Sequence, residues 1–80
     1  MTVAETSERD DVLVLEGEVV RLSRGDLYEV DCTAGSLRRT VLARRAGRLA
    51  MHHIKIISGD RVRVEVSAYD LSRGRITYRL

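Results

Sequence analysis

The sequence GRLAMHH, residues 47–53, differs in character from the rest of the chain. It is composed of helix-forming residues with no β-branched residue among them, so it predicts a short helix or a single helical turn. Three segments of strand-like composition precede it and two follow it. The position of this helix in the order of elements is what separates one small barrel architecture from another.

Five segments around the helix have the composition or the alternation of β-strands. The clearest is RVRVEV, in which Val62, Val64 and Val66 face one way and the charged residues face the other. We expect strands over residues 12–22, 27–32, 37–45, 61–66 and 75–80. We expect turns over residues 23–26, 33–36 and 58–60 and a loop over residues 70–74, all rich in Gly, Ser and Asp.

The same alternation predicts which side chains are buried. The expected core or core-edge residues of the second, third and last strands are Tyr28, Val30, Cys32, Leu37, Val41, Ala43 and Tyr78. Cys32 is the only cysteine, and on this face it is expected to be a small buried hydrophobic residue.

No strand is followed by the long helix that a parallel crossover needs, so a mostly antiparallel sheet is expected. Five short strands can close into a barrel, which removes exposed edges. The order of three strands, helix and two strands is that of the oligonucleotide-binding (OB) fold. We therefore predict an all-β domain over residues 12–80, a five-stranded antiparallel OB barrel. An SH3-like barrel is the rival. Residues 1–11 are expected to form an acidic, disordered tail.

Charge is unevenly distributed along these 80 residues. Residues 1–11 hold four acids and one base, whereas residues 38–63 hold eight bases and one acid. Arginine accounts for all but one of the 14 basic residues, and its planar fork suits phosphate oxygens. No apolar run approaches the roughly 20 residues of a membrane span, and no signal peptide is visible, so a cytoplasmic location is expected.

Catalytic constellations are not evident. His52 and His53 are adjacent, so on a helix their side chains diverge by about 100° and cannot share one metal ion without further ligands. Residues 23–26 lack the glycines and the lysine of a phosphate loop. We expect a protein that is not an enzyme and that uses no metal or cofactor.

The sequence contains clearer evidence for a binding face than for a catalytic site. In OB folds, ligands lie across strands two and three, between the loops joining strands one to two and four to five. The basic and aromatic residues on those elements are Arg24, Arg38, Arg39, Arg44, Arg45, Tyr69, Arg73 and Arg75. Cations neutralise phosphates and an aromatic ring stacks on a base, so this set predicts RNA binding. A ring at Tyr69 that simply covers the barrel end is the alternative.

Two runs carry a family resemblance: IKIISGDRVRVE at residues 54–65 and YDLSRGRI at residues 69–76. With them, residues 16–79 resemble the bacterial translation initiation factor one family. The resemblance implies a non-catalytic protein that binds ribosomal RNA at the aminoacyl-tRNA (decoding) site of the small ribosomal subunit. There it would block premature tRNA entry, contact a ribosomal protein and support the other initiation factors. By matched position it implies RNA contacts from Arg48, Lys55, Tyr69, Arg73 and Arg75.

Three departures indicate a divergent member of that family. Residues 49–53 replace a more basic, aromatic-containing segment, the connection between strands two and three is longer, and an acidic tail precedes the first strand. The longer connection supplies Arg38 and Arg39, which we expect to replace part of the lost charge, and Arg44 completes the predicted RNA-binding set. We expect a monomer. A general single-stranded RNA-binding module of cold-shock type and a protein-interaction barrel remain alternatives.

Overall fold

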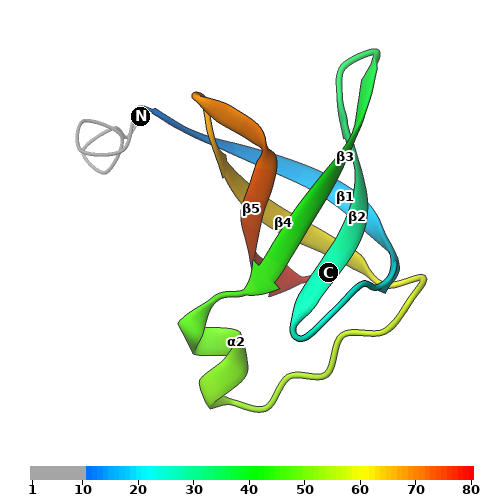
Figure 1. Cartoon of the computed structure of the whole chain (residues 1–80), viewed down its shortest axis with the longest axis vertical. Helices are drawn as coiled ribbons and strands as arrows, with labels where there is room; N and C mark the ends of the chain where they lie inside the picture. The colour runs from blue at the N-terminus through cyan, green and yellow to red at the C-terminus, as the bar shows by residue number, and fades with distance from the viewer. Residues whose placement is uncertain (1–10) are drawn as a thin grey trace.

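Five strands close into a barrel in the computed structural model, which describes residues 11–80 (Figure 1). Most of the predicted tail, residues 1–10, lies outside the described residues. The short helix follows the third strand, as predicted, and the OB architecture is confirmed. In chain order the elements are β1 (Val12–Leu22), β2 (Leu27–Ala34), β3 (Leu37–Arg45), α2 (Gly47–Met51), β4 (Arg61–Ser67) and β5 (Asp70–Arg79).

The strands follow the order β1-β2-β3-β5-β4 around the barrel, and β4 closes the ring against β1. Four neighbouring pairs are antiparallel, but β3 and β5 run parallel, with Leu42 opposite Arg73 and Arg44 opposite Arg75. The parallel pair is a consequence of closure, because an odd number of strands cannot alternate in direction all the way around a ring.

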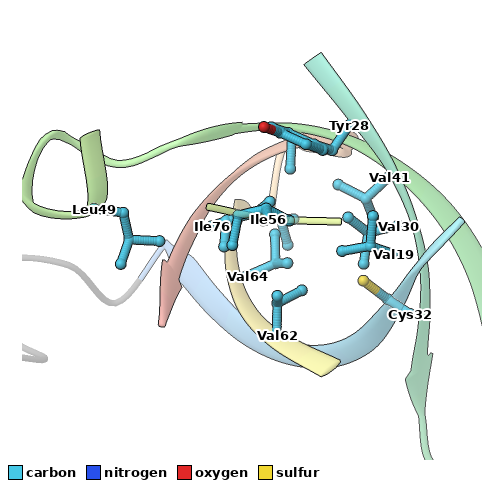
Figure 2. Packing of buried hydrophobic residues seen from close by; sticks show 12 residues of the cluster. Val19, Tyr28, Val30, Cys32, Val41, Leu49, Ile56, Val62, Val64 and Ile76 are labelled. Atoms are coloured by element: carbon cyan, nitrogen blue, oxygen red, sulfur yellow. The ribbon is translucent and has the colours of Figure 1, made fainter. Parts of the chain in front are cut away.

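The barrel interior is filled mainly by aliphatic side chains, with Tyr28 and Cys32 of β2, and all five strands contribute to it (Figure 2). The predicted core residues Tyr28, Val30, Cys32, Val41 and Ala43 are buried. The rest of the core is formed by Val19, Leu49, Ile56, Val62, Val64, Val66 and Ile76. Leu49 of α2 and Ile56 of the following segment belong to this cluster, which ties the helix and its loop to the barrel.

The loop predicted over residues 70–74 is wrong. The turn between β4 and β5 consists of Ala68 and Tyr69 alone, and β5 begins at Asp70. Gly74 lies within the strand, where a Cβ would come within 2.6 Å of the Glu65 carbonyl oxygen. This glycine therefore permits a close approach of two strands and does not form a turn.

Two predicted core positions are also wrong. Leu37 is 71% exposed, because the β2–β3 hairpin continues beyond the buried core and its turn begins only after Ala34. Tyr78 is 55% exposed, because the register of β4 and β5 shifts between Arg63 and Val64. That bulge puts Tyr78 opposite Arg63, on the outside of the barrel.

Candidate nucleic-acid interface

Three predicted RNA-binding residues come together on the outer face of β3 and β5. Ala43 and Ile76 face the core, so Arg44, Arg73 and Arg75 alternate to the outside. The parallel register sets Arg44 directly opposite Arg75. We call these three arginines the β3–β5 face.

The arginines of the β3–β5 face form only weak, solvent-exposed ion pairs with neighbouring acidic residues. Arg75 lies 3.3 Å from a Glu65 carboxylate oxygen, and Arg44 lies 3.6 Å from one of Asp26. Both arginine side chains are more than half exposed, so these pairs contribute little to stability and can exchange with a phosphate. Arg73 forms no ion pair with any of residues 11–80.

Arg38 and Arg39 do not lie on the same face of β3. They lie within β3, so their side chains leave opposite sides of the strand. Arg38 is on the outside and bonds to Asp31 of β2, whose hydrogen bond and negative charge raise the pKa of the guanidinium. Arg39, opposite Cys32 in the register, borders an apolar groove whose lining includes Leu13, Leu15, Leu37 and Leu71.

Tyr69 projects from the β4–β5 turn with 86% of its surface exposed, so it does not cover the barrel end. Its N–H donates to Ser67 Oγ at 3.0 Å. The next residue, Asp70, accepts from the hydroxyl and backbone N–H of Ser72 at 2.6 and 3.2 Å. These two hydrogen bonds, helped by the charge of Arg73, lower the pKa of Asp70. The turn is thus held by local bonds that leave the ring in solvent.

Arg48 and Lys55 lie at the helix end of the barrel. Both are exposed, and neither forms an ion pair with the described part of the chain. Arg45 was predicted to lie on the binding face, but its side chain bonds to the backbone of a neighbouring segment. Its side chain is half-buried and donates to the Ile54 carbonyl oxygen at 3.0 Å, which ties β3 to the segment after α2.

The outer face of β2 is not basic. Its outward residues include Glu29 and Asp31, and the neighbouring β1 adds Glu16 and Glu18. Glu29, Asp31 and Glu16 pair with Arg21, Arg38 and Arg63, so the cations near β2 are matched by acids, whereas Arg73 on β5 has no ion pair within residues 11–80. The basic outward residues Arg44, Arg73 and Arg75 thus lie over β3 and β5, one strand further around the barrel than the area predicted over strands two and three.

Tyr78 was missed as a possible contact. The Arg63 guanidinium lies 5.4 Å from the centre of its ring, on the outside of the barrel. Alternation from Ile76 puts Tyr78 inside, and no sequence signal marks the bulge that reverses it. Within residues 11–80 there is no cluster of three metal-ligating side chains and no helix long and apolar enough to span a membrane.

Comparison with known proteins supports the fold and the resemblance. No family model matches the chain. The solution structure of translation initiation factor one from the Wolbachia endosymbiont strain TRS of Brugia malayi aligns with a TM-score of 0.70 and 29% identity. The alignment covers 98% of this chain and 88% of that one. The molecule is thus an OB-fold protein with a basic outer face. Its resemblance to the initiation factor one family is confirmed.

A second solved structure shows the same fold within a much longer chain. The crystal structure of YjeQ from Thermotoga maritima aligns with a TM-score of 0.67 and 24% identity. The match covers 85% of this chain but only 23% of YjeQ. At this identity the likeness bears on the fold alone.

Proposed function

We propose that this chain is a translation initiation factor that binds ribosomal RNA at the decoding site of the small ribosomal subunit. One observation supports this function most directly: the same segment carries the family resemblance and part of the basic face. Residues 69–76, which carry much of the family resemblance, provide two of the three arginines of the β3–β5 face and the exposed Tyr69. The similarity to an initiation factor along 98% of the chain supports the same reading.

The chemistry of the face suits RNA. Arginines on adjacent strands can neutralise successive phosphates of one backbone, and each neutralised phosphate releases bound counterions. Extruding a base from a helix costs a few kcal/mol, which contacts to an aromatic ring and to guanidinium groups can recover. Arg44, Arg73 and Arg75 would hold phosphates, with Arg48 and Lys55 extending the contact at the helix end and Tyr69 at the opposite end.

In this function the protein is not an enzyme and needs no cofactor. It acts in the cytoplasm as a monomer, blocks premature tRNA entry and supports the other initiation factors. Its partners are the RNA of the small subunit, a ribosomal protein near the decoding site and those factors. Arg38 and Arg39 are weaker candidates, because one is bonded to Asp31 and the other borders the apolar groove.

Co-sedimentation with ribosomal subunits tests the proposal. The protein should bind small subunits at low salt and compete for the decoding site. The double variant Arg73→Ala/Arg75→Ala should bind more weakly, and the slope of its salt dependence should fall by about two. For a matched single change, Arg73→Ala should weaken binding more than Arg21→Ala, since Arg21 pairs with Glu29 at 3.1 Å on the acidic side of the barrel.

Three results would each contradict the proposed function in a different way. Unchanged binding by the double variant removes the β3–β5 face from the site. Equal affinity for large subunits or for any unstructured RNA indicates a general RNA-binding module. Absence of RNA binding leaves a protein-interaction barrel. A footprint of the ribosomal RNA with and without the protein then identifies the nucleotides contacted.

A further inference from the structure

A second aromatic side chain, Tyr78, stands on the outside of the barrel beside basic residues. Regular alternation in β5 puts it inside with Ile76, but a bulge in β5 turns it outward: Val64 is opposite Ile76 and Arg63 opposite Tyr78, so Thr77 has no partner in the register. Bulges are often found where a side chain is re-aimed toward a functional surface. The outward ring, with 55% of the residue's surface exposed, is accessible to a ligand.

The ring is held in place from one side. The Arg63 guanidinium lies 5.4 Å from the ring centre, and it also donates to Glu16 at 3.4 Å. A cation over the ring fixes its orientation by the attraction between the charge and the π-electrons. With 55% of its surface exposed, Tyr78 still has ring surface open to solvent.

Three more basic residues belong to segments at this end of the barrel, but only Arg61 shares the outer face with the Tyr78 ring. Arg79 is opposite the buried Val62 and next to Tyr78 in the strand, so its side chain leaves the other face. The Leu80 N–H donates to the Arg61 carbonyl oxygen at 2.8 Å, and Arg79 donates to the Lys55 carbonyl oxygen at 2.9 Å. Those bonds bring the segments that carry Lys55, Arg61 and Arg79 to the end of β5. None of the three side chains forms an ion pair within residues 11–80.

We propose that Tyr78 is the platform of a stacking site for one unpaired RNA base. Arg63 orients the ring, and Arg61, on the same outer face of β4, receives a phosphate beside that base. The site lies on β4 and β5, next to the β3–β5 face, so one RNA strand could cross both. It rests on the proposed RNA binding, but it does not depend on the decoding-site pose.

The test uses a single-stranded RNA of about ten nucleotides with one 2-aminopurine, whose fluorescence reports stacking. Tyr78→Leu should raise the Kd roughly 5-fold to 100-fold and remove most of the stacking signal, the range expected for loss of one base–aromatic stack. Tyr78→Phe keeps the ring and should bind within about 2-fold of the unaltered protein. Tyr78→Ile provides a second ring-free variant suited to a strand, and circular dichroism checks that all three are folded.

Unaltered affinity and fluorescence for both ring-free variants would overturn the stacking site. An equal loss in Tyr78→Phe and Tyr78→Leu would also overturn it, because the hydroxyl group and not the ring would then carry the contact. The proposed function has its own readout in small-subunit binding by the Arg73→Ala/Arg75→Ala variant. If subunit binding depends on Arg73 and Arg75 while the Tyr78 variants are neutral, only the stacking site fails.

Discussion

Gly74 shows how one residue permits two neighbouring strands of the barrel to pack closely. It lies where β5 passes both β4 and β3, opposite Val66 and Ala43. A Cβ at this position would lie 2.6 Å from the Glu65 carbonyl oxygen and 2.8 Å from methyl carbons of Val64 and Val66. Two of those contacts come from fully buried valines, so the neighbours have little room to move.

The substitution Gly74→Ala should therefore destabilise the protein by about 1–3 kcal/mol, the usual cost of overpacking. Urea unfolding followed by circular dichroism measures the change. Gly47→Ala is the matched control, because a Cβ there meets nothing within 4 Å at the start of α2. It should be neutral or stabilising by up to about 1 kcal/mol. Equal effects of the two substitutions would contradict the steric argument.

The buried thiol of Cys32 makes the stability of the protein depend on pH. Burial, with a smaller contribution from the negative charge of Asp31, raises the pKa of its thiol from 9.0 to about 11. The folded protein thus favours the neutral thiol. This stabilising contribution is complete below pH 9, the ordinary value, and is lost as the pH rises through about 11.

The free energy of unfolding should accordingly fall between pH 9 and 11, and part of that fall should vanish in Cys32→Ala. Urea unfolding at several pH values in this window measures the difference between the two proteins. Iodoacetamide should also modify the native thiol far more slowly than the thiol in urea, because the thiolate is the nucleophile. Rapid modification of the native protein at about pH 8, below the ordinary thiol pKa, would contradict a buried, neutral thiol.

At the scale of elements, the end of α2 is built from a common motif with an unusual residue. The Ile54 N–H donates to the Leu49 carbonyl oxygen at 3.0 Å, and the His53 N–H donates to that of Ala50 at 3.1 Å. This pair of bonds is the Schellman motif, which needs a residue with positive φ after the helix. His53 occupies that place with φ of 56°, where glycine is the usual choice.

Replacing His53 with glycine should stabilise the protein by about 1 kcal/mol, because a side chain in the left-handed region is strained. His52→Gly is the control. His52 has φ of −92°, so glycine relieves no strain there and should be neutral or destabilising. Thermal unfolding of the two variants compares them directly. A gain from His52→Gly equal to that from His53→Gly would mean that strain at His53 is not the cause.

For the molecule as a whole, charge divides the barrel into two sides. The outer residues of β1 and β2 include Glu16, Glu18, Glu29 and Asp31, whereas the outer residues of β3 and β5 include the arginines of the β3–β5 face. Such a division orients an approaching polyanion before any contact forms.

An NMR titration with short single-stranded RNA should show this orientation. Amide signals of β3, β5 and the outer residues of β4 should shift, while those at Arg21 and Glu29, which pair with each other on the acidic side, should stay in place. Raising the salt concentration several-fold should reduce all the shifts together, because phosphate contacts dominate the affinity. Shifts centred on β1 and β2 would contradict the charge argument.

Local patterns in the sequence were enough to predict the barrel and its helix. Valines at every second position specify a strand with one buried face, as at Val62, Val64 and Val66, and those residues are buried in the structure. The absence of a strand-like pattern over residues 47–53 predicted the helix for the same local reason. The family resemblance likewise depends on residues that are contiguous in the chain.

Tertiary structure was needed for three features of the candidate interface: the bulge that turns Tyr78 outward, the parallel register that sets Arg44 opposite Arg75, and the close approach at Gly74. The parallel register depends on ring closure, whereas the bulge and the close approach depend on how β4 and β5 pair within their hairpin. Alternation along one strand carries no information about its register against a neighbouring strand, so the sequence predicted Gly74 to be a turn residue and Tyr78 to be part of the core.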